Sequence, residues 1–507
     1  MLHFYTILPF LIFLFFLYKL FSTSRSTGKQ LPPSPKTLPI IGNLHQISRL
    51  PHRSLHSLSQ QHGELMLVHF GRKPVLVVSS SKAACQIMKT HDTIFADRPQ
   101  LKIFKRLIYN CKDIATAPYG DYWKHIRSIC VLHLLSPKRV QSFHHIREEE
   151  VAHMIGEIEQ SSSTTTSVNL SKLFVNFSSD IICRVAFGLK FKGETDGINF
   201  KELMERHEKL VGGIHIGEFI PWLSWINYVN GVESEIKKVA KDMNRCLEGI
   251  IQQHVDRRDQ VQSGVEENNH DKSKDLVDVL LELQHDDMNN SSLDQESIKA
   301  IIMDMFVAGT TTTYATLEWA MSELLRSPKA MESVTSEVRR ITGGKASIIT
   351  DNKLEKMTYL KAVIKETFRL HPPVPLLLPR ISMQDAKIHG YDIPARTLVM
   401  INAWAIHRDP TSWTEPEEFK PERFLDSPVD YKGQYFDLIP FGSGRRGCPG
   451  MLFAISNIDL ALANLIDKFD WRLPDSADGN ALDMTEYPGL TAHRAVPLLA
   501  LATPRYG

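Results

Sequence analysis

The chain has 507 residues, of which 43% are hydrophobic and 23% charged, an ordinary balance for a globular protein. A net charge of +1 without a long basic run argues against a nucleic-acid partner. Six scattered cysteines form no C-x-x-C pair, so neither a disulfide framework nor a zinc ribbon is expected, and a reducing compartment is favoured.

The first predicted element is an apolar run from Leu2 to Phe21, and a bilayer-spanning helix takes about 20 such residues. Lys19, Arg25 and Lys29 lie at its end and beyond it, whereas a cleaved signal peptide carries its positive charges before the apolar core. We therefore expect residues 1–21 to form an uncleaved membrane anchor. The positive-inside rule then places the rest of the chain in the cytosol.

Residues 22–43 are basic at first and then rich in proline, as in Leu31-Pro-Pro-Ser-Pro35. Proline prevents helix continuation and favours a stiff, extended connector, so this segment is predicted to be a hinge. Residues 44–507 show no internal repeat and no strong boundary. They are expected to form the catalytic domain.

The body begins with a predicted β-hairpin, in which residues 65–70 and 74–79 flank the turn at Gly71. From about Ser81 to Ala500 the pattern is mainly helical. Two polar tracts, residues 161–167 and 260–275, are predicted to be exposed loops.

A long helix is predicted from a capping box at Ser292–Gln295 to about Leu325, since apolar residues recur with a period of 3.6. Its middle reads FVAGTTTTY, from Phe306 to Tyr314. Glycine costs about 1 kcal/mol relative to alanine inside a helix, and threonine is also a weak helix former. The run therefore indicates that something other than helix stability selects these residues.

A glycine-rich loop, Pro440 to Gly450, lies near the C-terminus. It contains G-x-G-x-x-G, but only 60 residues follow Gly447, too few for the rest of a dinucleotide-binding domain.

Cys448 offers a better explanation of this loop, because Pro449 and a predicted helix, Met451–Phe469, follow it. A helix N-terminus favours a thiolate, and Arg445 and Arg446 add positive charge. Cys448 is therefore a candidate ligand of a redox-active metal, whereas the other cysteines are expected to be buried and structural.

The loop resembles the haem-ligand signature of the cytochromes P450, F-x-x-G-x-R-x-C-x-G, at Phe441, Gly444, Arg446, Cys448 and Gly450. Three further motifs of that family follow the expected order: W-x-x-x-R at Trp123 and Arg127, E-x-x-R at Glu366 and Arg369, and P-E-R-F at Pro421–Phe424. The resemblance covers nearly the whole chain and is strongest to plant microsomal members of specialised metabolism. It implies a mainly α fold with a small β-region, preceded by a single N-terminal transmembrane helix.

The resemblance also implies the cofactor and its contacts. Haem b would be held by Cys448 as the iron ligand. The other expected cofactor-binding residues are Trp123, Arg127, Arg380, Phe441, Arg446 and Gly450. Glu366, Arg369 and Arg423 would form a buried charge cluster behind the haem; residues three apart lie on one helical face.

The FVAGTTTTY run resembles the family's oxygen-side motif, so Ala308, Gly309 and Thr312 are the expected catalytic residues. Ala308 and Gly309 would make room for oxygen, and the Thr312 hydroxyl would help to deliver protons. Thr311 departs from the family, which carries an acid there. A water chain, a nearby acid such as Asp304, or slower proton delivery would each accommodate this departure.

The family's recognition segments place the substrate against apolar side chains, which favours a small hydrophobic molecule. The expected pocket residues are Val374, Leu376, Leu377, Leu378 and Leu490. The segment from Phe219 to Trp225 is a candidate for contact with the membrane surface, because tryptophans favour the interface.

The resemblance thus implies a monooxygenase of the endoplasmic reticulum membrane that oxidises a terpenoid, phenylpropanoid or coumarin-like compound. Its electrons would come from NADPH through NADPH–cytochrome P450 reductase, with cytochrome b5 as a second partner that the family allows. The alternative is a haem-thiolate dehydratase or isomerase that needs no dioxygen, and Thr312 argues against it.

Overall fold

The computed structural model describes residues 28–506 except 163–166, 191–193, 196–197, 214, 263–273, 287–292, 345–346 and 475–478. The predicted anchor, residues 1–21, and the predicted cap Ser292 lie outside this part. Among the described residues, no helix combines the length and the apolar character needed to cross a bilayer.

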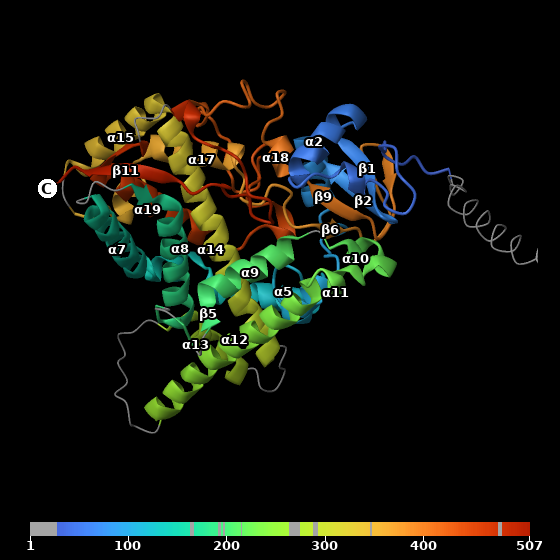
Figure 1. The fold of residues 1–507 in the computed structure, drawn as a ribbon, viewed down its shortest axis with the longest axis horizontal. Coiled ribbons are helices and arrows are strands. Elements are labelled where there is room, and N and C mark those ends of the chain that lie inside the picture. The colour runs from blue at the N-terminus through green and yellow to red at the C-terminus, as the bar shows by residue number, and fades with distance from the viewer. Residues whose placement is uncertain are drawn as a thin grey trace, which may run out of the picture.

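The body is mainly helical, as predicted, and one long helix, α14, runs through its middle (Figure 1). The helices are α2 (Pro51–His62), α3 (Ser81–Cys85), α4 (Lys102–Leu107), α5 (Asp121–Ile129), α6 (Pro137–Ser142), α7 (His144–Ser162), α8 (Leu170–Phe187), α9 (Phe200–Gly212), α10 (Ile216–Phe219), α11 (Ile226–Val229), α12 (Val232–Gln262), α13 (Leu276–Asp286), α14 (Gln295–Arg326), α15 (Pro328–Thr342), α16 (Asp351–Leu354), α17 (Thr358–Leu370), α18 (Ala403–Ile406) and α19 (Met451–Lys468).

Helix α14 is central because it is buried on nearly all sides. It packs against α8, α13, α15, α17 and α19. The consecutive residues 317–320, which point in four directions around its axis at about 100° per residue, are all at most 2% exposed. Burial of this kind offsets the weak helix propensity of the glycine and threonines, so the helix continues through them.

The start of α14 differs from the predicted capping box. The helix begins at Gln295, and the Asp294 carboxylate accepts a hydrogen bond of 2.8 Å from the Ser297 backbone N–H. Asp294, which the sequence analysis placed inside the box, is therefore the N-cap residue.

The main sheet lies to one side of the helices, and its strand order is β1-β2-β9-β6 (Figure 1). The strands are β1 (Leu65–Phe70), β2 (Lys73–Val78), β3 (Val168–Asn169), β4 (Glu194–Thr195), β5 (Ile198–Asn199), β6 (Arg380–Ile381), β7 (Ala386–Ile388), β8 (Tyr391–Ile393), β9 (Leu398–Ile401), β10 (Phe469–Arg472) and β11 (Leu499–Pro504). β1 and β2 form the predicted antiparallel hairpin. β2 then pairs in parallel with β9, and β6 pairs antiparallel to β9, so the sheet carries Arg380 toward the site described below.

The described part of the proline-rich segment is fastened to β1 of this sheet and to β8 of the separate β7-β8 pair. The carbonyl of Pro33 accepts a hydrogen bond of 2.8 Å from the Leu67 N–H, and the Gln30 N–H donates to Asp392 at 2.8 Å. Gly42 has φ +62°, and a Cβ there would stand 2.3 Å from the carbonyl oxygen of His69. Residues 30, 33 and 42 of the predicted hinge are therefore held against the body by these contacts.

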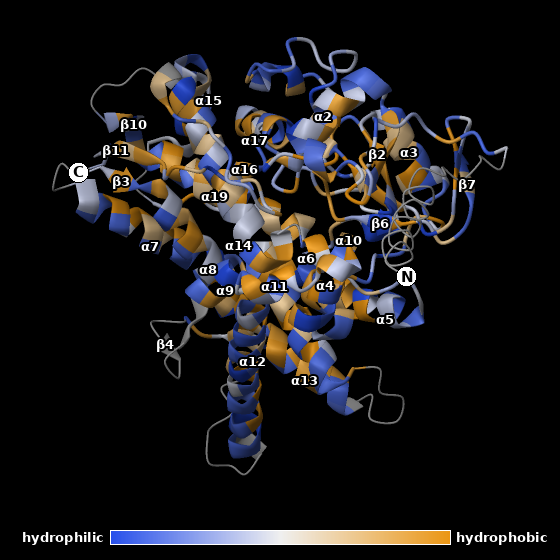
Figure 2. Ribbon diagram, turned by 45° about the vertical axis from the view of Figure 1, so that its right-hand side comes forward, coloured by the Kyte–Doolittle hydropathy of each residue, from blue (hydrophilic) through white to orange (hydrophobic). Residues whose placement is uncertain are grey.

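The two polar tracts begin as helix. α7 reaches Ser162 and α12 reaches Gln262, and the residues that follow each are outside the described part. α12 extends from the body as a largely hydrophilic helix (Figure 2).

Candidate functional site

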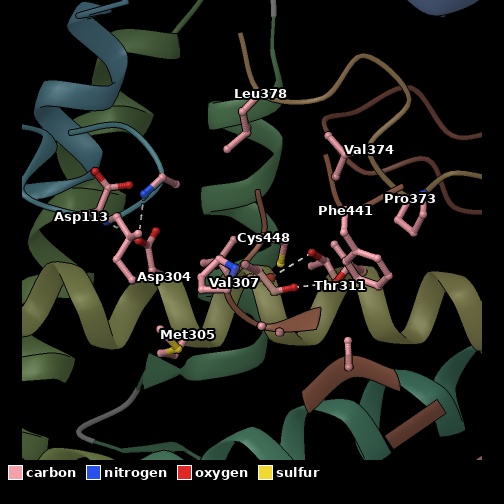
Figure 3. Close-up of a pocket in the computed structure, with 18 of the residues that line it drawn as sticks. Asp113, Asp304, Met305, Val307, Thr311, Pro373, Val374, Leu378, Phe441 and Cys448 are labelled. Carbon is pink, nitrogen blue, oxygen red and sulfur yellow. Dashed lines mark hydrogen bonds between the residues drawn. The ribbon is translucent and has the colours of Figure 1, made fainter. Parts of the chain in front are cut away.

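A cavity of about 320 Å³ lies between α14, the cysteine loop and the segment before β6. Figure 3 shows Cys448 and Phe441 from the loop near Thr311 of α14, with Val374 and Leu378 on another wall. The site therefore brings together residues that are widely separated in the sequence.

The cysteine loop has a fixed backbone. The Cys448 N–H donates to the Phe441 carbonyl at 2.9 Å, and α19 begins three residues later. Gly444 has φ +70°, and a Cβ there would stand 2.2 Å from the Met88 carbonyl oxygen, so only glycine fits. Cys448 lies deep inside the protein. Its exposed surface therefore faces the cavity and not the outside of the molecule.

The cation nearest in effect to the Cys448 thiol is Arg127, which differs from the predicted pair of arginines. Burial raises the pKa of the thiol, and the N–H groups of Gly450 and Met451, with the charge of Arg127, oppose that rise. The neighbouring positive charge was predicted to come from Arg445 and Arg446. Arg445 instead pairs with Asp92 at 3.2 Å, and Arg446 donates to the carbonyls of Ala96, Ile114 and Ala117.

Four of the described residues that line the cavity are arginines: Arg98, Arg127, Arg380 and Arg446. Arg98 donates to the carbonyls of Ala115, Leu378 and Pro379 at 2.7–2.9 Å. Burial and the charges of Arg380 and Arg446 hold its pKa well below the usual range. Buried charges that repel one another favour an acidic ligand. Arg98 was missed by the sequence analysis, because no motif marks it.

Trp123 has a different position from the predicted one. It is not among the residues that line the cavity, and its indole N–H donates to the Ile114 carbonyl at 3.0 Å. Its ring lies 4.1 Å from the Arg446 guanidinium and 5.6 Å from that of Arg127. Trp123 therefore positions two cavity arginines by cation–π contact, and has no donor left for the cofactor.

The charge cluster is assembled behind the cysteine loop. Arg369 donates to both oxygens of Glu366 at 2.7 and 2.8 Å, and both side chains are fully buried. Arg423 donates to the same carboxylate at 3.0 Å. Arg369 also donates to the carbonyls of His407, Pro416 and Glu418, so the cluster orders the chain between α18 and the cysteine loop.

The threonines of α14 are not equivalent. Thr311 and Thr312 line the cavity together with Ala308, whereas Thr313 is buried away from it. The hydroxyls of Thr311 and Thr312 donate to the carbonyls four residues earlier, at 2.9 and 2.7 Å.

Gly309 has a packing role that the sequence analysis did not foresee. A Cβ at this position would stand 2.6 Å from Cδ1 of Ile182 on α8. Gly309 therefore allows α14 and α8 to approach closely, in addition to lining the cavity.

The Gly309→Ala variant is expected to lose about 1 kcal/mol of unfolding free energy, because the strain of overpacking exceeds the gain in helix propensity. Adding Ile182→Val removes the clashing methyl group and should restore stability. The unfolding free energies of the wild type, both single variants and the double variant, measured by thermal unfolding, form a double-mutant cycle. Strictly additive effects would contradict this packing role.

Asp304 cannot replace the missing acid at position 311. It accepts hydrogen bonds from the N–H groups of Ile114 and Ala115 at 2.7 and 3.3 Å, and lies beside Asp113 (Figure 3). Burial and the charge of Asp113 raise its pKa well above the usual range. Eight residues also separate it from Thr312, about 12 Å along the helix.

Most of the predicted substrate residues line the cavity, namely Val374, Leu377, Leu378 and Leu490. Leu376 does not, which corrects that prediction. It packs against the buried side chains of α2, β1 and β2, because the chain turns at Leu377, whose φ is +50°.

The chemical groups that line the cavity fit haem b. Cys448 presents a thiol to the cavity, the arginines supply cations for acidic groups, and the wall beside Phe441 and Phe453 is apolar. Cysteine is the ligand of the iron in haem–thiolate proteins.

The comparisons agree with this geometry. Residues 32–494 match the family model of cytochrome P450. Cytochrome P450 736A117 of Prunus mume is 51% identical over 98% of this chain and 95% of its own length. Tabersonine/lochnericine 19-hydroxylase of Catharanthus roseus is 47% identical over 99% of this chain and 98% of its own.

Solved structures share the fold. A zebra fish cytochrome P450 structure with abiraterone superposes with a TM-score of 0.73 at 24% identity, covering 90% of this chain and all of the other. The family model and the extensive plant relatives lead to one conclusion: the chain belongs to the cytochrome P450 family, among the plant members of specialised metabolism.

Proposed function

We propose that the protein is a haem-thiolate monooxygenase that hydroxylates or otherwise oxidises a small hydrophobic plant metabolite of terpenoid, phenylpropanoid or coumarin-like type. The observation that carries the proposal is that Cys448 lines one cavity together with Ala308, Gly309, Thr311 and Thr312. A plant relative named as a hydroxylase supports it.

Haem is the cofactor that family membership implies. Cys448 would hold its iron, Phe441 and Gly450 would border it, and Arg98, Arg127, Arg380 and Arg446 would neutralise its acidic groups. When bound, thiolate-ligated haem supplies the activation of dioxygen.

The chain itself controls protons and water. Thr312 is the residue we assign to proton donation, with Ala308 and Gly309 shaping the space beside it. In the described structure its hydroxyl proton is directed at the Ala308 carbonyl, so it must release this bond to donate elsewhere. Since Thr311 also donates to a carbonyl and Asp304 is held by the loop before α5, proton delivery relies on water.

The Thr311→Asp variant should therefore release less hydrogen peroxide per NADPH consumed, because an acid beside Thr312 supplies protons directly. Thr311→Val, which removes the hydroxyl and keeps the shape, is the matched control and should not improve coupling. Peroxide and NADPH are measured together in the reductase-supported reaction. If Thr311→Asp neither improves coupling nor speeds turnover, the missing acid does not limit the enzyme.

We further propose that residues 1–21 anchor the protein in the endoplasmic reticulum membrane as a single-pass segment, with 22–43 as the hinge and 44–507 as the cytosolic catalytic domain. Trp222, Trp225 and Tyr228 support a second membrane contact, because they are 57–67% exposed near α10 and α11. The electron donor would be NADPH–cytochrome P450 reductase, with cytochrome b5 as an additional partner.

A further inference from the structure

The cavity has a second polar region, which the proposed chemistry does not use. Apart from the arginines, the Asp113–Asp304 region, the α14 threonines and Cys448, its described polar lining is His207, Glu208 and Thr491. His207 and Glu208 lie on α9, and Thr491 lies in the segment that α9 packs against, where a Cβ on Gly212 would stand 2.6 Å from the Leu490 nitrogen.

His207 is buried without partners. It is 2% exposed, and neither ring nitrogen has a hydrogen-bond partner; the nearby Leu107 backbone does not meet hydrogen-bond geometry. Burial lowers the pKa of the imidazole to about 4, so the ring is neutral and offers one N–H donor and one nitrogen acceptor. Buried groups of this kind are rarely left unpaired, and a ligand group is one way to satisfy them.

Glu208 presents a carboxyl group to the same cavity. Thr491 lies beside it and lowers its pKa, but burial dominates and raises the pKa to about 7. The Thr491 hydroxyl is in turn 3.4 Å from that of Thr311, so the carboxyl group lies on the α14 side of the cavity. A group bound at Glu208 is therefore held near the catalytic segment.

We propose that His207 and Glu208 anchor a hydroxyl group of the substrate, so that the enzyme acts on a hydrophobic alcohol. A hydroxyl group can accept from the imidazole N–H and donate to the carboxylate at once. A ketone only accepts, so it can meet the imidazole N–H but leaves the Glu208 carboxylate unmatched. This inference rests on the proposed function, since it concerns how that enzyme orients its substrate.

The test is equilibrium binding to the haem-loaded protein, measured by calorimetry without NADPH at a pH well above the Glu208 pKa of about 7, where the carboxyl group is ionised. The probes are the bicyclic alcohol borneol and the ketone camphor, which has the same carbon skeleton but no donor. The wild-type protein should bind borneol about tenfold more tightly, as expected for a hydrogen bond to a charged group. Glu208→Leu should abolish this preference and leave camphor binding unchanged, whereas His207→Phe should weaken both ligands.

Glu205→Gln is the matched control, one turn earlier on α9 and exposed, and it should retain the preference. Glu208→Gln keeps the side-chain shape and an acceptor oxygen but removes the negative charge, so it should reduce the preference for borneol. It provides the test if the Glu208→Leu protein does not fold. Equal binding of borneol and camphor by the wild type, or equal weakening of both by Glu208→Leu, would overturn the anchor. Neither result bears on oxygen chemistry, so this failure is distinguishable from failure of the proposed function.

Discussion

The Cys448→Ser variant is expected to lose monooxygenase activity and the carbon monoxide absorption band that defines the family. The serine hydroxyl cannot replace a thiolate as electron donor to the iron. The fold should persist, because the loop backbone is held by the bond from the residue 448 N–H to the Phe441 carbonyl, which the substitution retains. The measurement is the reduced, carbon monoxide-bound spectrum with matched haem content.

Cys85→Ser is the control for this experiment. Cys85 is half-buried at the end of α3 and does not line the cavity. Its replacement should leave the band unchanged. A Cys448→Ser protein that kept the band would show that another residue holds the iron.

Arg369→Ala should have the largest effect on stability, about 3–5 kcal/mol, because it leaves the fully buried Glu366 carboxylate short of its main partner. Among the described residues, only Arg423 and the Lys420 backbone N–H still donate to it, and three backbone carbonyls lose their donor as well. Thermal and denaturant unfolding should both report the loss, and haem incorporation should fall because the loop behind the site is no longer ordered.

Lys124→Ala is the comparison for this effect. Lys124 and Asp121 also form an i,i+3 pair, but both side chains are exposed, and such pairs add little to stability. No resolvable change is expected. Should Arg369→Ala unfold at the wild-type midpoint, the cluster would not be the stabilising element described above.

Local patterns predicted much of the fold. The 3.6-residue periodicity located α14 to within a few residues of its end, and the glycine turn located the β1–β2 hairpin. α17 ends before His371-Pro-Pro373, as proline chemistry requires. The pairing of β2 with β9 was not predicted, because it joins residues more than 300 positions apart by a parallel contact that leaves no local signal.

The candidate site likewise contains some residues that local patterns predict and others that they do not. Motif residues such as Cys448, Thr312 and Arg446 meet at one cavity, because the family fold brings these motifs together. Arg98, His207 and Glu208 carry no motif, and only the tertiary structure brings them to the wall. The packing role of Gly309 and the outward turn of Leu376 depend on neighbouring helices and strands that no local window contains.

The central claim is that the enzyme inserts an oxygen atom from dioxygen into a small hydrophobic molecule. Its most direct test incubates microsomes containing the protein, the reductase and NADPH with a plant metabolite extract under isotopically labelled dioxygen. We predict products that gain one labelled oxygen atom and that form only with NADPH. Products that form without NADPH or dioxygen would contradict the claim and indicate the dehydratase or isomerase alternative.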